Sequence, residues 1–256
     1  MAAASLQPFL DFAIDAAFQA GRHTLAYFRA GVAVERKADQ SPVTVADREA
    51  EQILRRLIAA RHPDHAVVGE EYGTTGRSSH TWVIDPIDGT QSFIRGVPLY
   101  GVMVGLVREG APVAGAIYFP ALDEMVAAAR GLGCRANGRP ARVSTVSRLA
   151  DACISSTDGR ALAARLGAGW ARLAGGVSVV RGWGDCYGHC LVATGRADAM
   201  LDPAMHPWDC AALVPILEEA GGRFTGWRGQ DGIEMPDAVS SNGELHEELL
   251  GYLKDA

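Results

Sequence analysis

The amino-acid sequence predicts an α/β (α+β) fold made of two halves that share an interface. Two long segments of helical periodicity come first, and short runs rich in valine, isoleucine and aromatic residues follow them. Helical and strand-like segments then alternate to the end of the chain, an order typical of helices packed in layers against sheets. We expect the boundary within residues 143–152 and assign residues 1–147 to the first half and residues 148–256 to the second.

The first element is an amphipathic helix over residues 6–28, and the segment "GVAVERK" after it predicts a short strand. A second helix follows Thr44, whose hydroxyl can cap it, and stops before His62-Pro63, because a residue before proline disfavours helical backbone angles. Its expected buried face consists of Ala50, Ile53, Leu54, Leu57 and Ile58.

The strands of the first half are predicted by short apolar runs bounded by glycine and proline. These runs read "HAVVGEE", "TWVIDP", "YGVMVGLVREG" and "APVAGAIYFP". The segment "MVAAARGLGCRANGRP" continues the series and contains Asn137-Gly138, a pair that favours a hairpin turn. We therefore expect mostly consecutive strands here.

The second half is predicted to alternate helices with strands. Helices are expected near residues 158–168 and over residues 185–194, where Gly195 ends the helix. The segment "ADAML" predicts a strand, and a core helix over residues 209–220 follows, which Pro215 should bend.

The composition argues against several classes of partner. With 48% hydrophobic residues, the 256-residue chain can bury a large core. A formal net charge of −6 argues against nucleic acid or an anionic membrane as the main partner. No apolar run approaches the roughly 18 residues of a membrane span, and "MAAASLQPFLDFAIDAAF" lacks the basic region of a signal peptide, so we expect none. The five cysteines form no CxxC pair, which favours reduced thiols in the cytoplasm.

The stretch "VIDPIDGTQSF" places two carboxylates close together at the end of a strand. Asp85 ends the apolar run, and Pro86 fixes its own backbone angle, so the next residues can curl back. The Ile87 carbonyl and the Asp88 carboxylate can then point toward the same place as Asp85. Oxygen ligands without histidine or cysteine suit Mg²⁺ or Mn²⁺ rather than zinc.

The residues after these carboxylates suit a phosphate group. The backbone N–H groups of Gly89 and Thr90 can point at an anion, and the Thr90 hydroxyl can hold a water. Two Mg²⁺ ions about 3.5–4 Å apart can stabilise both oxygens of an in-line displacement. A plain turn is the alternative, since Asp, Pro and Gly are all turn residues, but the whole string with Glu70 upstream favours a site.

Three motifs together resemble the inositol monophosphatase family of Mg²⁺-dependent, lithium-sensitive phosphatases. They are "GEE", "WVIDPIDGTQSF" and "HPWDCAALVPILEEAGG", and the likeness extends from the first helix to the last. The resemblance implies the layered α-β-α-β-α sandwich of the inositol monophosphatase / fructose-1,6-bisphosphatase type. It also implies a cytoplasmic homodimer, a small phosphate monoester as substrate, and direct attack by water without a phosphoenzyme.

The resemblance also assigns roles to single residues. The implied ligands of two or three Mg²⁺ ions, with Mn²⁺ as a substitute, are Glu70, Asp85, the Ile87 carbonyl, Asp88 and Asp209. Glu70 and Thr90 match residues that orient and activate water, and Asp47 matches an aspartate that supports the threonine. Gly89 and Thr90 match the donors to phosphate. Ordinary alternatives exist for Asp47, as a first-turn helix acid, and for Asp209, as a helix N-cap.

Two departures from the inositol pattern bear on the substrate. Ser92 replaces the usual asparagine, and "RGWGDCYGHCLVATGRADAMLDP" replaces a small neutral run. The second segment is similar to the histidinol-phosphatase branch of the family, in which "WGDxYxY" recurs, although His189 stands where the branch often has tyrosine. The branch implies hydrolysis of L-histidinol phosphate in histidine biosynthesis.

Histidinol phosphate carries an ammonium and an imidazole, and the segment offers matching groups. Asp185 and Asp202 can provide negative charge to the cation, and Trp183 or Tyr187 can flank the imidazole. Asp185 could instead be a helix N-cap, and the aromatics could be core residues. Arg181 could pair with an active-site carboxylate.

Three rival interpretations remain open. The chain could be an inositol-1-monophosphatase or a broad-specificity sugar or nucleotide phosphatase of the same family. A non-catalytic regulator is a second possibility, but such a protein would be expected to have lost a ligand. A zinc cluster is disfavoured because its candidate ligands lack paired spacing: Cys186, His189, Cys190, His206 and Cys210.

Overall fold

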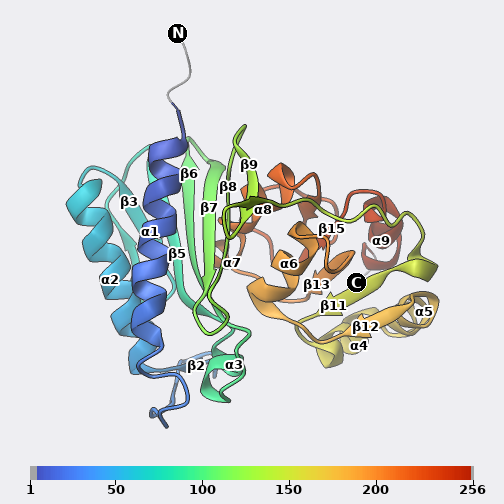
Figure 1. Ribbon diagram of the computed structural model, residues 1–256. Coiled ribbons are helices and arrows are strands. Elements are labelled where there is room, and N and C mark those ends of the chain that lie inside the picture. The colour runs from blue at the N-terminus through green and yellow to red at the C-terminus, as the bar shows by residue number, and fades with distance from the viewer. Residues whose placement is uncertain (1–4, 255–256) are drawn as a thin grey trace.

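Two sheets, each covered by helices, form the framework of the computed structural model, which describes residues 5–254 (Figure 1). Residues 1–4 and 255–256 lie outside the described residues, so the outermost ends of both predicted halves and the start of the segment weighed as a signal peptide are not covered. None of the helices described between residues 5 and 254 combines the length and apolar character needed to cross a membrane.

The first sheet has eight strands in the order β10-β9-β8-β7-β6-β5-β3-β4. All neighbours are antiparallel except β3 and β5. The strands are β3 (Ala66–Gly69), β4 (Gly73–Thr75), β5 (His80–Asp88), β6 (Gly101–Arg108), β7 (Ala111–Phe119), β8 (Glu124–Ala129), β9 (Gly133–Ala136) and β10 (Arg139–Pro140). Helices α1 (Gln7–Thr24) and α2 (Val45–Arg61) cover its outer face (Figure 1).

The second sheet has five strands in the order β12-β11-β13-β15-β14. They are β11 (Cys153–Ser156), β12 (Val179–Arg181), β13 (Ala199–Asp202), β14 (Arg223–Thr225) and β15 (Ala238–Ser241). Helices α6 (Asp185–Ala193) and α8 (Leu213–Glu219) lie between the two sheets, and α4 (Gly159–Leu166), α5 (Ala168–Gly176) and α9 (His246–Leu253) lie on the far side (Figure 1). The order of layers is therefore α-β-α-β-α, which confirms the predicted sandwich.

Three apolar clusters fill the spaces between these layers. One joins α1 and α2 to the first sheet, one surrounds α6 and α8, and one joins α4, α5 and α9 to the second sheet. Shorter elements complete the chain: β1 (Glu35–Arg36), β2 (Pro42–Val43), α3 (Thr90–Ile94), the 3₁₀ turn η1 (Leu149–Asp151) and α7 (Pro207–Cys210). The predicted division at residue 147 falls between β10 and η1 and stays a prediction.

Several local predictions are confirmed. The Thr44 hydroxyl accepts a hydrogen bond from the Ala46 N–H and so caps α2, which ends at Arg61. Asn137 and Gly138 both have positive φ, at 46° and 76°, as a tight hairpin turn requires. Helix α6 ends before Gly195, whose φ is +70°.

Other local predictions are wrong. Helix α1 ends at Thr24 rather than at residue 28, and only two residues of "GVAVERK" form a strand. Strands β4, β11, β12, β14 and β15 and helices α5 and α9 had no prediction. The helix expected over residues 209–220 is two helices divided at residues 211–212, although a break four residues before Pro215 agrees with the bend expected from that proline. Pro215 explains that break, because it lacks the N–H that would bond to the Ala211 carbonyl and its ring crowds that carbonyl.

A flat area on the first sheet receives the junction of α7 and α8. Gly105 and Gly115 are paired across β6 and β7. A Cβ at Gly105 would lie 2.7 Å from the Ala211 carbonyl carbon, and one at Gly115 would lie 2.3 Å from the Ala212 oxygen. The two glycines therefore let the helix junction rest directly on the sheet, and this contact positions Asp209 two residues earlier.

Candidate active site

A β-bulge at the end of β5 brings its two carboxylates to one side. Asp85 pairs with Met103 and Asp88 with Gly101, so β5 has one more residue than β6 between these pairs. In a regular strand, residues three apart face opposite sides of the sheet, and the extra residue removes that opposition. The Ile87 N–H donates a hydrogen bond of 2.9 Å to Asp85 Oδ1, which closes the bulge.

Asp85, Asp88 and Asp209 form an acidic cluster. One carboxylate oxygen from each lies within 4.8 Å of the others. Burial, followed by the neighbouring carboxylates, raises the pKa of Asp85 and of Asp209 well above the ordinary value. Burial also raises the pKa of Asp88, although the Cys186 N–H donates to its Oδ2 at 2.5 Å. One buried and two half-buried carboxylates in mutual repulsion fit a hard divalent cation, which would offset their charge and prefers oxygen ligands.

Over residues 5–254, no other set of three His, Cys, Asp or Glu side chains has ligand atoms this close together. The residues considered as a zinc cluster are thus not gathered around one point. All five cysteines are free thiols.

Asp209 is fixed by the first turn of α7. Its Oδ2 accepts a hydrogen bond of 2.7 Å from the His206 N–H, the residue that precedes the helix. Asp209 is therefore at the third helical position and not the N-cap that the sequence suggested as an alternative. The His206 ring stacks on Trp208, with centroids 4.9 Å apart.

Glu70 lies on the turn after β3 and contacts a lysine. Lys37 Nζ is 2.7 Å from Glu70 Oε1 and 2.5 Å from Glu71 Oε1. Although burial acts to lower it, the pKa of Lys37 is raised because the two carboxylates stabilise its charge. Burial raises the pKa of Glu70 to about 7, against the opposing effect of Lys37.

The turn that carries Glu70 is stabilised by hydrogen bonds to Glu51, a buried residue of α2. Glu51 accepts hydrogen bonds from the Glu71 N–H at 2.7 Å and the Tyr72 N–H at 3.1 Å, and it pairs with Arg55 Nε at 2.7 Å. A Cβ at Gly69 would lie 2.2 Å from Glu51 Oε1. Glycine at this position is therefore what admits the carboxylate beneath the turn.

Thr90 and Asp47 meet at the start of α3. The Thr90 hydroxyl can donate to the Ile87 carbonyl at 3.1 Å and to Asp47 Oδ1 at 3.5 Å. Asp47 is fully buried, and its Oδ2 accepts from the hydroxyl of Thr44 at 2.6 Å and from the N–H of Thr44 at 2.8 Å. Gly89 precedes α3 with a φ of +84°, a left-handed conformation that suits glycine.

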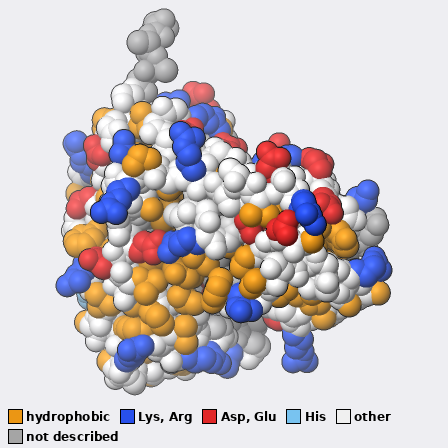
Figure 2. All heavy atoms as spheres, turned by 45° about the vertical axis from the view of Figure 1, so that its right-hand side comes forward, with side chains coloured by type: hydrophobic (Ala, Val, Ile, Leu, Met, Phe, Trp, Pro, Cys, Tyr) orange, Lys and Arg blue, Asp and Glu red, His pale blue; other side chains and the backbone are white. Residues whose placement is uncertain are grey.

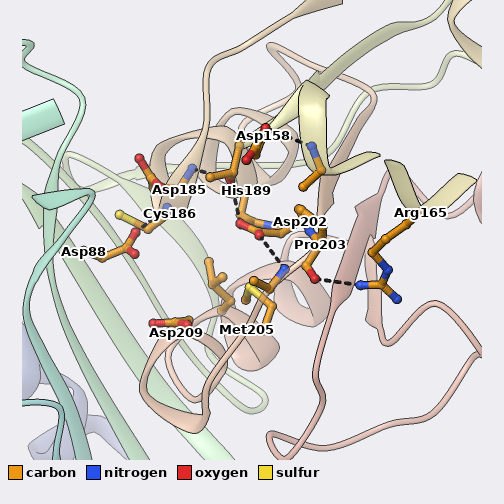
Figure 3. A pocket seen from close by; sticks show the side chains of 14 residues that line it. Asp88, Asp158, Arg165, Asp185, Cys186, His189, Asp202, Pro203, Met205 and Asp209 are labelled. Carbon is orange, nitrogen blue, oxygen red and sulfur yellow. Dashed lines mark hydrogen bonds and ion pairs between the residues drawn. The ribbon is translucent and has the colours of Figure 1, made fainter. Parts of the chain in front are cut away.

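These residues line a first cavity, here called the metal-side cavity. Its wall includes Lys37, Glu70, Asp85, Ile87, Asp88, Gly89, Thr90, His206, Trp208 and Asp209. A second cavity adjoins it and shares Asp88 and Asp209 (Figure 3). We call it the acidic cavity, because Asp158, Asp185 and Asp202 also line it.

A chain of hydrogen bonds orders the wall of the acidic cavity. The Asp185 N–H donates to Thr157 Oγ1 at 2.9 Å, and the Thr157 hydroxyl donates to Asp202 Oδ2 at 2.6 Å. Asp185 has a φ of +56°, a strained value for a residue with a side chain. A Cβ on Gly89 would lie 3.0 Å from Asp185 Oδ2, so this carboxylate borders the predicted phosphate loop. Burial raises the pKa of Asp202 to about 7.

The carboxylates of the acidic cavity are not neutralised by its arginine. Arg165 donates to the Pro203 carbonyl at 2.7 Å, pairs with Asp237 at 2.7 Å and lies over the Trp227 ring at 4.0 Å. The positive charge of Arg165 is therefore already paired with Asp237. Figure 3 shows its hydrogen bond to the Pro203 carbonyl. The cavity therefore favours a ligand with positive charge.

Trp183 and Tyr187 do not line the acidic cavity, and both pack against the apolar cluster around α6 and α8, which agrees with the core alternative rather than with contact to an imidazole. The Tyr187 ring packs edge-on against Phe119 at 5.2 Å, in the cluster around α6 and α8. Arg181 donates to the Val180 carbonyl and has no carboxylate partner among the described residues.

Several residues of the site had no prediction, among them Lys37 and Glu51 on the metal side and, in the acidic cavity, Thr157, Asp158, Arg165 and His189 as a cavity residue. A signal existed for Glu51, which follows Asp47 by four residues and so shares its helix face. An acid on a face otherwise buried is unusual and indicates a specific partner.

Comparison with known proteins gives consistent matches. The profile described as "Inositol monophosphatase family" matches residues 5–256. A Chlorobaculum parvum protein named "Histidinol-phosphatase" is 44% identical over 261 residues, covering 97% of each chain. A Mycobacterium tuberculosis protein of the same name is 39% identical over 233 residues, covering 86% of this chain and 87% of that protein. The solved structure of inositol monophosphatase from Anabaena (Nostoc) sp. PCC 7120 superposes with a TM-score of 0.85 at 31% identity, covering 97% of this chain and 96% of that one.

Proposed function

The chain belongs to the inositol monophosphatase family and is a phosphatase, and from this premise we propose that it hydrolyses L-histidinol phosphate to L-histidinol and phosphate. The observation that carries the proposal is the acidic cavity beside the acidic cluster, with Asp158, Asp185 and Asp202 in its wall. Histidinol has an ammonium group and a basic imidazole, whereas inositol has only hydroxyls. None of these three carboxylates has a Lys or Arg partner among the described residues, so the cavity favours the cationic leaving group over the neutral one. The names of two relatives agree with this choice.

The metal required would be Mg²⁺, in two or three ions, with Mn²⁺ as a substitute. The groups that would hold it are the carboxylates of Glu70, Asp85, Asp88 and Asp209 and the Ile87 carbonyl. When bound, Mg²⁺ supplies positive charge that stabilises the phosphoryl oxygens in the transition state and makes water more acidic.

The residues of the chain have separate tasks in the proposed reaction. The backbone N–H groups of Gly89 and Thr90 would orient the phosphate at the start of α3. The Thr90 hydroxyl, supported by Asp47, and the Glu70 carboxylate would orient the attacking water. Glu70 lies with Thr90 in the wall of the metal-side cavity, where its carboxylate would accept the proton of that water. The new bond joins the water oxygen to phosphorus, the ester P–O bond breaks, and the alcohol leaves with a proton.

We also propose that the enzyme is a cytoplasmic homodimer inhibited by Li⁺ at millimolar levels, as family membership suggests. Hydrophobic side chains gather on one face below the middle of the molecule, as Figure 2 shows, and such a face supports association. Charges of both signs are scattered over the same view, without a basic patch there that would suit nucleic acid.

The test measures phosphate release with Mg²⁺ from L-histidinol phosphate and from myo-inositol 1-phosphate at equal concentrations. We expect kcat/KM to favour histidinol phosphate by about a hundredfold, which corresponds to about 2.7 kcal/mol of transition-state discrimination. Asp185→Ala should reduce this preference because it removes one carboxylate from the acidic cavity. A preference for inositol phosphate would contradict the substrate and leave the phosphatase assignment standing.

A further inference from the structure

His189 is a buried residue of the acidic cavity with one ring nitrogen unpaired. Its side chain is 1% exposed, and its Nδ1 lies 2.5 Å from Ser240 Oγ on β15. Within residues 5–254, Nε2 has no hydrogen-bond partner although it is inaccessible to solvent. Buried polar atoms are nearly always paired, so an unpaired one beside a cavity indicates a place for a ligand.

The unpaired nitrogen points toward a carboxylate across a gap. His189 Nε2 is 4.0 Å from Asp202 Oδ2, which is too far for a hydrogen bond. Asp202 already accepts from the Thr157 hydroxyl at 2.6 Å and from the Ala204 N–H at 3.2 Å. Figure 3 shows His189 and Asp202 side by side in the wall of the cavity, with Asp185 one helical turn before His189.

The chemistry of the two groups limits what can fill this gap. Burial lowers the pKa of His189 to about 3, so the ring is neutral at physiological pH and has one donor and one acceptor nitrogen. If Nδ1–H donates to Ser240 Oγ, Nε2 presents a lone pair next to the carboxylate. Two acceptors facing one space need a group that donates twice, and a protonated nitrogen also supplies charge.

The position of His189 suits a group distant from the phosphorus. His189 lines the acidic cavity and not the metal-side cavity, whereas Asp88 and Asp209 line both. A phosphate held at the shared residues would leave the other end of the ester in the acidic cavity. The ring of His189 also packs edge-on against Phe224, at 5.5 Å between centroids, and this contact limits its rotation.

We propose that His189 Nε2 and Asp202 Oδ2 together bind a protonated nitrogen of the leaving alcohol, which makes His189 a specificity-determining residue. This inference rests on the proposed function and names the nitrogen-bearing end as what the cavity recognises. The shared chemistry is an N–H donor with positive charge, whether an ammonium or an imidazolium. His189 acts on binding and takes no part in bond breaking.

The first experiment compares His189→Phe, His189→Gln and wild type on four phosphate esters. L-histidinol phosphate carries both groups, phosphoethanolamine only the ammonium, 3-(imidazol-4-yl)propyl phosphate only the imidazole, and β-glycerophosphate neither. For His189→Phe we expect KM for the esters that bear the bound nitrogen to rise at least about tenfold more than KM for β-glycerophosphate. His189→Gln, which keeps polar atoms, should restore part of the difference. Comparison of the two single-nitrogen esters identifies which nitrogen is bound.

The matched control is His246→Gln, since His246 is also fully buried but lies on α9, away from both cavities. Its two nitrogens are paired with Thr225 and Ser241 at 3.0 and 2.8 Å. This variant should keep the wild-type ratio of KM values. An equal loss on all four esters in His189→Phe would show a structural role only and would overturn the inference.

A second measurement uses the wild-type protein and therefore does not depend on whether a variant folds. In protein labelled with ¹⁵N-histidine, the Nε2 signal of His189 should have the shift of an unprotonated nitrogen and should move when L-histidinol is added. A protonated Nε2, or a signal that L-histidinol leaves in place, would overturn the inference. If wild type prefers histidinol phosphate and these results are negative, only the role of His189 fails. If wild type shows no such preference, the proposed function fails.

Discussion

Substitution of Gly115 by alanine should damage both the fold and the metal site, because no other space is available for the new methyl group. The added Cβ would lie 2.3 Å from the Ala212 oxygen and 2.7 Å from its Cα. Ordinary contact begins at 3.4 Å, so the backbone at residues 211–212 must retreat by about 1 Å. Both alanines there are fully buried, and the sheet beneath them cannot yield easily.

The expected magnitude follows from two opposing contributions. Overpacking that shifts the backbone destabilises the folded state by about 1–3 kcal/mol. Alanine also lowers the entropy of the unfolded chain, which stabilises the protein by about 0.4–1 kcal/mol. A net loss of about 1–2 kcal/mol should lower Tm by about 3–6 °C in a chain of this size. Asp209, two residues before the displaced segment, would move by more than the roughly 0.5 Å that a metal site tolerates, so Mg²⁺ affinity should fall at least about tenfold.

Thermal melting and Mg²⁺ titration calorimetry check this prediction together. Gly159→Ala is the matched control, because Gly159 begins α4, a Cβ added there would meet no atom within 4 Å, and its φ is not positive. It should keep Tm and Mg²⁺ affinity close to wild type. If Gly115→Ala behaves like Gly159→Ala in both assays, then the glycine pair does not position Asp209 and the reasoning is refuted.

Three further predictions concern single residues. Asp88→Asn should reduce kcat at least about a thousandfold. Without metal, this variant should have a higher Tm than wild type, because one of the repelling charges is gone. Addition of Mg²⁺ should raise its Tm less than that of wild type. Glu51→Gln should lower Mg²⁺ affinity by loosening the turn that carries Glu70, with little change in the substrate KM at saturating Mg²⁺. A Mg²⁺ titration identical to that of wild type would contradict the role of Glu51. Burial lowers the pKa of His246 to about 4, so the unfolded chain binds a proton that the folded protein excludes between pH 6.5 and 4. The free energy of unfolding should therefore decline as pH falls through that window. Denaturant titrations at several pH values measure this decline. In His246→Gln the free energy of unfolding should depend on pH less steeply than in wild type, by at most about 1.4 kcal/mol per pH unit.

Single helices and turns were predictable because their signals are local, whereas the order of the layers was implied by the resemblance to the family. Thr44 caps α2 through its own side chain, and the turn at Asn137-Gly138 depends only on its two residues. The geometry of Asp85 and Asp88 is likewise determined by adjacent residues, since Pro86 and the β-bulge lie between them. The candidate metal ligands and phosphate-loop residues, with Asp185 and Asp202, line one of two adjoining cavities, whereas Asp47 contacts Thr90 outside them and Trp183 and Tyr187 line neither.

The errors arose where distant parts of the chain decide the outcome. The helix break at residues 211–212 depends on the contact with Gly105 and Gly115 as well as on Pro215. The position of Tyr187 depends on Phe119, which is 68 residues earlier in the sequence and packs against it. The tie between Glu51 and the turn after Gly69 likewise exists only once α2 has packed beside β3. No pattern of spacing within one segment contains this information.

The division of the site into two cavities has a consequence for how such an enzyme can change. The metal-side cavity is built mainly from the end of β5, the start of α3 and α7, whereas Asp158, Asp185, His189 and Asp202 come from elements of the second sheet and its helices. Mutations in the latter set can exchange one alcohol for another without touching the machinery that cleaves the ester. Substrate range can therefore diverge among descendants of one ancestral catalyst, with Asp88 and Asp209 as the fixed border between what is retained and what is free to vary.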